Sequence, residues 1–404
     1  MYNPYFTYLL SFTLAFLTYN LKWSYLFPDL KVETWIFFVF TFLISIAMGI
    51  VFVKKKMDTF YKIEYRKNYR VYTFLILIGY GIEFMYSRSI PLLNLFVGDN
   101  SVIYMTFGIP VFHVFLVTFN SFLAIYLFHV LLSTGLKKYV LIPFLILVST
   151  PLLIVNRAMF LMILTSCFII YFCKKRRVRF RTLLFGMLII MLVLYSFGIL
   201  GNLRVNNSYS REPDPFDNTV IFQVGGVSSN FLNSLIPEPY FWSYIYLASP
   251  LANFQQTVDN SNVSTSLENL FIYATNNWFP DFISKRINTL EDWHVPKIYQ
   301  ISPELNVGTI YGEAFTQFGW LGCLLMFVVL SLTAFIYLIS LRNAKSDFYL
   351  TGLAIFCTIF LFSSFSNMFT FSGLSFQLIY PILFTITERL KSRKTSKKIV
   401  TSDL

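Results

Sequence analysis

The chain has 404 residues, of which 56% are hydrophobic and only 13% are charged. This composition excludes an ordinary soluble domain, because runs of about 20 apolar residues recur and each can cross a hydrocarbon core about 30 Å thick. The runs are continuous rather than alternating, which excludes a transmembrane β-barrel. The formal net charge of +12 by itself is compatible with nucleic-acid binding, but the positions of the basic residues along the chain favour another explanation.

Ten apolar segments predict an all-α polytopic membrane protein with about ten transmembrane helices, forming a single integral membrane domain over residues 1–404. In chain order they are residues 5–21, 33–53, 71–87, 109–133, 139–155, 157–173, 181–201, 312–341, 348–367 and 370–387. A further apolar piece, residues 240–251, is bracketed by prolines and is too short to span. We expect it to be re-entrant or interfacial.

The basic residues predict the orientation of the chain in the membrane. Most of the 32 Lys and Arg fall into clusters after every second apolar segment and in the tail. The positive-inside rule then places both termini in the cytoplasm, with residues 388–404 as a basic cytoplasmic tail, and nucleic acid is not an expected partner. The clusters are Lys54, Lys55, Lys56, Lys62, Arg66, Lys67 and Arg70; Lys137 and Lys138; Lys174, Lys175, Arg176, Arg177, Arg179 and Arg181; Arg342 and Lys345; and Arg389, Lys391, Arg393, Lys394, Lys397 and Lys398.

One long polar segment, residues 202–311, separates the seventh and eighth apolar segments. The charge pattern predicts that it is a large extracytoplasmic loop. Nucleotides are absent on that side of the membrane, and the chain has neither a P-loop nor a dinucleotide fingerprint. Chemistry there needs a substrate that is already activated, and lipid-linked pyrophosphates are the common class.

Three arginines stand at the predicted outer ends of apolar segments, namely Arg88, Arg157 and Arg204. Arginine at this depth is costly unless it is paired or functional. Its planar donor fork suits phosphate oxygens, so we predict that the three bind a pyrophosphate. The alternative is that each side chain simply extends to the membrane interface.

The transfer of a glycan needs a base that takes a proton from the acceptor hydroxyl. Glu313, at the start of the eighth segment, is the first candidate, and charge balance for a nearby arginine is its alternative role. His294 is the second candidate, and it could be an ordinary loop residue. The loop aromatics Tyr240, Trp242, Trp278 and Trp293 could stack on sugar rings or pack against the membrane surface.

The sparse cysteines and histidines predict no metal site. Cys167, Cys173, Cys323 and Cys357 lie in or at the ends of apolar segments, where small core residues are expected. His113 and His129 are too far apart on one predicted helix to share a ligand. We therefore expect no metal and no other cofactor.

Residues 308–322, GTIYGEAFTQFGWLG, resemble the segment that closes the large outer loop of bacterial O-antigen and capsule repeat-unit polymerases (Wzy type). Asn156 and Arg157 resemble an arginine site at the start of a span in that family, and residues 198–204 resemble its passage into the large loop. In the family an acid commonly precedes the Phe-Gly pair, whereas this chain has Gln317.

The resemblance implies a glycosyltransferase of the bacterial cytoplasmic (inner) membrane. It would transfer a growing glycan from undecaprenyl pyrophosphate to the next lipid-linked repeat unit, without metal or nucleotide. The implied partners are undecaprenyl-pyrophosphate-linked oligosaccharide and membrane lipids, with a chain-length regulator and a flippase of the same pathway as candidates. Two alternatives stay open: an O-antigen ligase-like enzyme that uses the same donor, and a non-enzymatic transporter of lipid-linked oligosaccharide.

Overall fold

The computed structural model describes residues 2–64, 68–97, 107–175, 180–209, 214–263 and 266–402. Within these ranges every regular element is a helix, and extended pairing is limited to single bridges between Ser24 and Val227 and between Thr309 and Ser366. The expected all-α class is therefore confirmed. Five of the basic residues used above to orient the chain lie outside the described residues: Arg66, Lys67, Arg176, Arg177 and Arg179.

The first half of the bundle is built around α1 (Pro4–Tyr19). This helix packs against α2 (Val32–Lys54), α11 (Tyr240–Asn260) and α15 (Tyr349–Phe362). Its aromatic face, with Tyr5, Tyr8 and Phe12, is fully buried. The Tyr8 hydroxyl lies 2.7 Å from the hydroxyl of Tyr311, which ties the N-terminal helix to the residues just before α14.

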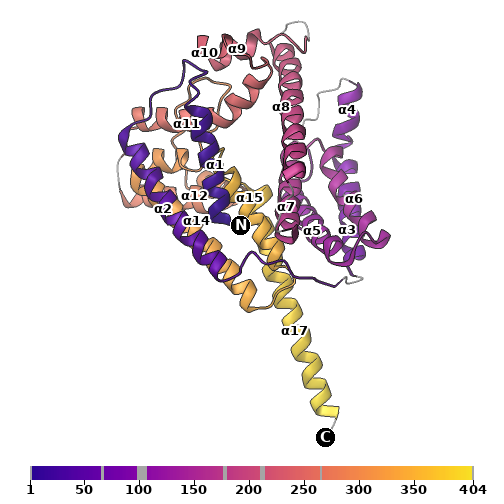
Figure 1. Cartoon of the computed structure of the whole chain (residues 1–404). Helices are drawn as coiled ribbons and strands as arrows, with labels where there is room; N and C mark the ends of the chain where they lie inside the picture. The colour runs from indigo at the N-terminus through magenta and orange to yellow at the C-terminus, as the bar shows by residue number, and fades with distance from the viewer. Residues whose placement is uncertain are drawn as a thin grey trace.

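The second half is centred on α5 (Phe112–Thr134), whose residues are mostly buried. Around it pack α3 (Asn68–Ser87), α6 (Lys138–Leu153) and α7 (Arg157–Lys175), with the short α4 (Pro91–Val97) against α6. In Figure 1 these helices stand on the opposite side of the molecule from α2.

The segment predicted as a large loop is folded into helices. The preceding helix α8 (Phe180–Ser208) extends beyond the predicted end at residue 201. It is followed by α9 (Thr219–Gly225), α10 (Ser229–Leu232), α11, α12 (Leu267–Trp278) and α13 (Asp281–Leu290). Helices α9 and α10 lie at one end of α8 (Figure 1).

The apolar piece at residues 240–251 is longer than the sequence suggested. Helix α11 continues through Pro250 to Asn260, giving 21 residues. It packs between α1, α8 and α14, and most of its residues from Phe241 to Thr257 are buried. The apolar run ends early in the sequence because the rest of the helix carries polar residues, of which Asn253, Gln255 and Thr257 are buried.

Helix α14 (Gly312–Asn343) is interrupted near its start. Phe318 (φ −144°, ψ 17°) and Gly319 (φ 59°, ψ −150°) leave the helical conformation and offset the first two turns from the long apolar part. The Gly319 dihedrals belong to a region that is nearly exclusive to glycine. The Phe-Gly-x-x-Gly pattern therefore marks a break inside this helix.

The C-terminal part begins with α16 (Ser372–Ser375) and the 3₁₀ turn η2 (Phe376–Leu378). It continues as α17 (Ile379–Ser402), whose far end projects away from the bundle (Figure 1). The last predicted segment thus starts with short turns instead of one helix. The predicted tail, residues 388–404, is a continuation of α17 as far as Ser402.

Among the described residues, five helices are long and apolar enough to cross a membrane: α2, α5, α7, α8 and α14. Apolar side chains of α8 such as Leu184, Phe185 and Leu188 are at least half exposed, as lipid contact requires. The protein is therefore of the membrane-embedded helical class. A helix occupies each of the ten predicted segments, but the number of crossings stays a prediction.

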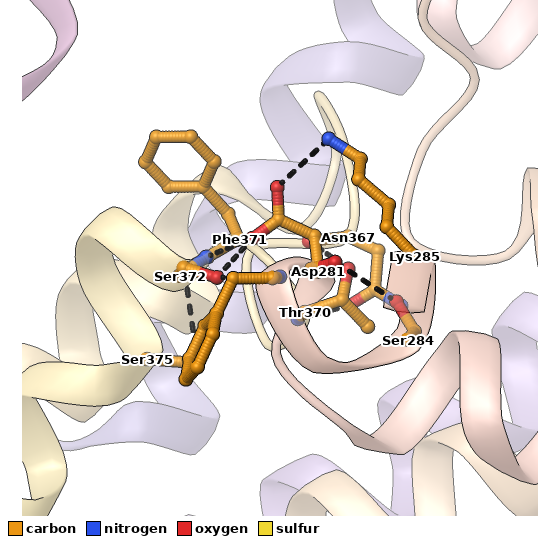
Figure 2. A network of polar contacts seen from close by, with 9 residues as sticks. Asp281, Ser284, Lys285, Asn367, Thr370, Phe371, Ser372 and Ser375 are labelled. Atoms are coloured by element: carbon orange, nitrogen blue, oxygen red, sulfur yellow. Dashed lines mark hydrogen bonds and ion pairs between the residues drawn. The ribbon is translucent and has the colours of Figure 1, made fainter. Parts of the chain in front are cut away.

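A polar network fixes α13 to the connection between α15 and α16 (Figure 2). The Asp281 carboxylate accepts hydrogen bonds from the backbone N–H (3.1 Å) and the hydroxyl of Ser372, and its own backbone N–H donates to the Thr370 carbonyl at 2.8 Å. Lys285 lies 3.4 Å from the same carboxylate. Asp281, the first residue of α13, thereby joins this helix to the first residue of α16.

Candidate functional site

A cavity of about 750 Å³ lies between α7 and α8, with Trp242 of α11 in its lining. We call it the α7–α8 groove. Its walls are almost entirely apolar, and the two arginines that line it are Arg157 and Arg204. The lining residues are Arg157, Phe160 and Leu161 of α7; Ile189, Leu192, Val193, Ser196, Phe197, Leu200, Gly201 and Arg204 of α8; and Trp242 of α11.

The spacing of the α8 residues explains why one helix face forms this wall. Ile189, Val193, Phe197, Leu200 and Arg204 follow at intervals of three and four, which places them on one side of a helix. From Ile189 to Gly201 the wall is about 18 Å long at helical rise. Arg204 stands on the same face, one turn beyond the apolar stretch.

Arg157 is held at the first position of α7 by its neighbour Asn156. The Asn156 side-chain oxygen accepts a hydrogen bond from the backbone N–H of Met159 at 2.9 Å, which is an N-cap contact. Asn156 is buried, whereas Arg157 is exposed. The Asn-Arg pair thus starts the helix whose first residue, Arg157, lines the groove.

Arg204 is positioned by polar residues on the other side of α8. Buried Asn202 donates to the Pro215 carbonyl at 3.0 Å and to Asn218 at 2.8 Å. Buried Asn206 donates to the carbonyls of Asp214 and Asp217. These contacts fix the end of α8, while the exposed Arg204 stays free of ion pairs to any residue that the structure describes.

Trp242 closes the groove where α11 crosses α8. It is buried, and its indole Nε1 donates to the Asn202 side-chain oxygen at 2.6 Å. The crossing is close because α8 has glycines there: a Cβ on Gly198 would lie 2.1 Å from the Pro239 carbonyl oxygen, and one on Gly201 would lie 2.6 Å from the Trp242 ring.

A second cavity of about 270 Å³ adjoins the first, and we call it the loop pocket. Arg204 and Trp242 line both cavities. The polar residues that line the loop pocket include Tyr209, Glu304 and Asn306, and its aromatic lining includes Tyr246 and Phe365. The rings of these two aromatics are stacked at 6.2 Å with an interplanar angle of 4°.

Glu304 is the carboxylate of the loop pocket. It accepts hydrogen bonds from the hydroxyl groups of Ser302 and of Tyr209, the latter at 2.5 Å. The hydrogen bond from Ser302 is the largest cause that lowers the pKa of Glu304, and that from Tyr209 is the next. The same contact with Glu304 raises the pKa of Tyr209. The carboxyl group is exposed and is ionised at neutral pH.

The backbone around Glu304 is held by one buried amide from α11. Asn253 donates to the carbonyls of Leu305 and Val307 and accepts from the backbone N–H of Ile301 at 2.9 Å. This side chain fixes the chain on both sides of Glu304. The carboxylate is therefore presented from a fixed stretch of backbone.

Comparison with family models, curated proteins and solved structures finds no match for this chain. The resemblance to repeat-unit polymerases therefore rests on the sequence motifs, and the site must be interpreted from its own geometry.

Three of the predicted site residues, Arg157, Arg204 and Trp242, line the α7–α8 groove. Arg88 is exposed at the end of α3, with φ 49°, and lines neither cavity. Two of the three arginines predicted to bind the pyrophosphate, Arg157 and Arg204, thus line one cavity.

The two predicted bases lie elsewhere. Glu313 is the second residue of α14 and His294 lies between α13 and α14; both are exposed and neither lines either cavity. Gln317, which stands where the family commonly has an acid, accepts a hydrogen bond from buried Asn277 at 2.9 Å. That contact joins α12 to α14.

The other predicted sugar-binding aromatics are also outside the two cavities. The Tyr240 hydroxyl donates to the Met191 carbonyl at 3.1 Å, so this ring packs along α8. Trp278 stands edge-on to Tyr273 at 5.6 Å, and Trp293 follows the end of α13. Neither tryptophan lines a cavity described here.

Glu304, Tyr209 and Asn253 are not among the residues that the sequence singles out. Its position five residues before Thr309, close to the start of α14, could have marked Glu304 as a candidate. No spacing pattern connects it to Tyr209, which is 95 residues away in the chain.

Proposed function

We propose that the chain is a polymerase of lipid-linked oligosaccharide repeat units. It transfers the growing glycan from undecaprenyl pyrophosphate to the next lipid-linked unit at the outer face of the cytoplasmic membrane. The observation that carries this proposal is that Arg157 and Arg204 are the two arginines in the lining of one apolar groove.

The groove matches the two chemical parts of such a donor. Its apolar wall of about 18 Å suits part of a polyprenyl chain, which gains free energy wherever it packs against side chains without polar groups. Exposed apolar residues of α8 continue beyond the groove, so the remainder of the lipid can stay in the bilayer.

The arginines supply the charge that a pyrophosphate needs. Neither guanidinium makes an ion pair within the described part of the chain, so both are available for phosphate oxygens. Bidentate contacts of this kind are geometrically specific and stronger than neutral hydrogen bonds. As the bond from sugar to phosphate breaks, negative charge grows on the pyrophosphate, and fixed positive charge beside it lowers the barrier.

Binding of the donor tests this proposal. Purified wild-type protein is titrated with undecaprenyl pyrophosphate and with undecaprenol, and the stabilisation against heat is measured. Tighter binding of the pyrophosphate is expected, with Arg157→Ala and Arg204→Ala each weakening it by about 10- to 100-fold, as loss of a charged hydrogen bond implies.

Arg286→Ala is the matched control, because Arg286 is exposed on α13 and lines neither cavity. It should bind the pyrophosphate like the wild type. Equal affinity for undecaprenol and its pyrophosphate, or unchanged binding in both arginine variants, would contradict the proposed donor site.

A further inference from the structure

The lining of the loop pocket suggests how the acceptor glycan is bound and deprotonated, and this inference rests on the proposed function. We propose that this pocket binds the terminal sugar of the acceptor glycan and that Glu304 is the base that takes the proton from its attacking hydroxyl. The basis is the arrangement of two adjoining cavities with Arg204 and Trp242 in common.

The shared residues define where two substrates would meet. Arg204 stands at the end of the apolar groove and also lines the loop pocket. A pyrophosphate bound by Arg204 therefore places the anomeric carbon of its sugar at the junction of the two cavities. A nucleophile reaching that carbon from the side opposite the leaving group must come from the loop pocket.

The lining of the loop pocket suits a sugar. Stacked Tyr246 and Phe365 and the ring of Trp242 offer flat apolar surfaces. Asn306 offers both a donor and an acceptor for hydroxyl groups. The volume of about 270 Å³ is appropriate to one or two sugar rings and too small for a lipid chain, which leaves the groove for the donor lipid.

Glu304 is built as a fixed carboxylate in this pocket. Asn253 holds the backbone on both sides of it, and the hydroxyl groups of Tyr209 and Ser302 orient its oxygens. A carboxylate oxygen accepts up to two hydrogen bonds, so the oxygens retain capacity for a substrate hydroxyl.

The reaction balances without a further reactant. The acceptor oxygen forms a bond to the anomeric carbon, and the bond from that carbon to the pyrophosphate oxygen breaks with its electron pair. The acceptor proton goes to Glu304, and the polyprenyl pyrophosphate leaves beside Arg157 and Arg204. The protonated carboxyl group then releases its proton to solvent, to which it is exposed.

The test compares two isosteric variants, Glu304→Gln and Glu313→Gln. Lipid-linked repeat unit extracted from cells lacking this protein is the substrate, and the initial rate of chain extension by purified protein is measured. Glu304→Gln is expected to slow extension by about 10²- to 10⁴-fold, the usual contribution of a general base, while undecaprenyl pyrophosphate binds as in the wild type. Glu313→Gln is expected to retain the wild-type rate within about threefold.

The outcomes separate this inference from the proposed function. Wild-type extension with a fully active Glu304→Gln variant would overturn the role of Glu304 and leave the polymerase proposal standing. A large loss in Glu313→Gln with little loss in Glu304→Gln would move the base to Glu313. If the wild type itself extends nothing, the polymerase proposal fails, and the inference fails with it.

Discussion

The indole Nε1 of Trp242 donates a hydrogen bond of 2.6 Å to the side-chain oxygen of Asn202. This contact joins α11 to α8 at the place where the α7–α8 groove meets the loop pocket. It is buried, and it belongs to a chain of contacts in which Asn202 also holds Asn218, and Asn218 donates to Glu238 at 2.8 Å. Asn202 therefore holds Trp242, a residue that lines both cavities.

Asn202→Ala should destabilise the protein by about 1–3 kcal/mol, because it leaves the Trp242 N–H and the Asn218 oxygen buried without their partner. Thermal unfolding in detergent micelles measures this. Asn207→Ala is the control, since Asn207 is exposed on the same helix and its loss should change the free energy of unfolding by less than about 0.5 kcal/mol. Equal melting temperatures for the two variants would show that the asparagine network is unimportant.

Gly198→Ala should disrupt the crossing of α8 and α11, because the new Cβ would lie 2.1 Å from the Pro239 carbonyl oxygen. The backbones must separate, so we expect a loss of stability of several kcal/mol or misfolded protein. Gly186→Ala on the same helix has open space around the added carbon, and alanine favours helix over glycine by up to about 1 kcal/mol. Size-exclusion chromatography and thermal unfolding compare the two. A well-folded Gly198→Ala variant would contradict the close crossing.

Gly319→Ala should also be destabilising, but for a conformational reason. Among the described residues a Cβ there meets only Val263, at ordinary contact distances of 3.8 and 3.9 Å, so we assign the cost of about 1–3 kcal/mol to the backbone angles. Gly81→Ala, in the interior of α3 and with open space, should be neutral or stabilising. The same thermal scan measures both variants, and a neutral Gly319→Ala would mean that α14 is not broken at this residue.

Asp281→Ala should loosen the connection between α13 and α16 shown in Figure 2. The backbone and hydroxyl of Ser372 lose their acceptor, which we expect to cost about 1–2 kcal/mol, as for a lost N-cap. Asp29→Ala is a suitable comparison, because its pair with Lys22 is exposed and surface pairs contribute about 0–1 kcal/mol. Limited proteolysis between α12 and α14 should accelerate in the first variant alone. Unchanged cleavage would show that the network does not secure α13.

The pH dependence of activity tests how Glu304 is held. The pKa of Glu304 is lowered in the folded protein. Its carboxylate therefore contributes to stability at pH values above the ordinary glutamate pKa of about 4.3. This contribution is lost as the pH falls through the lowered pKa. Tyr209→Phe removes one of the two hydroxyl donors, which should raise that pKa and shift the acid limb of the rate profile to higher pH. Ser133→Ala, on the distant helix α5, should leave the profile unchanged. An unmoved acid limb in Tyr209→Phe would contradict the contact between Tyr209 and Glu304.

Much of the helical framework could be predicted from the sequence because apolar runs in a membrane protein report directly on helix position. Arg157, Arg204 and Trp242 could be singled out for a similar reason: charge and aromatic side chains at the ends of apolar segments are unusual enough to be noticed. That all three line one cavity is a tertiary feature of how α7, α8 and α11 are arranged.

The interior of the long polar segment could not be predicted. Glu304 enters the loop pocket because Asn253 holds residues 301–307 and because Tyr209 reaches it from the end of α8. Both contacts are tertiary, and neither leaves a local pattern. His294, Trp278 and Trp293 lie away from the cavities because α12 packs on α14 and α13 is bound to residues 370–372, which no periodicity indicates.

Chain extension in a defined mixture tests the central claim most directly. Purified wild-type protein is incubated with extracted lipid-linked repeat unit, without nucleotide, and the products are separated by size. The proposal predicts a ladder of glycans spaced by one repeat unit, and its loss in the Arg157→Ala, Arg204→Ala double variant while Arg286→Ala still makes it. An absence of longer products with the wild type, or a normal ladder from the double variant, would contradict the account.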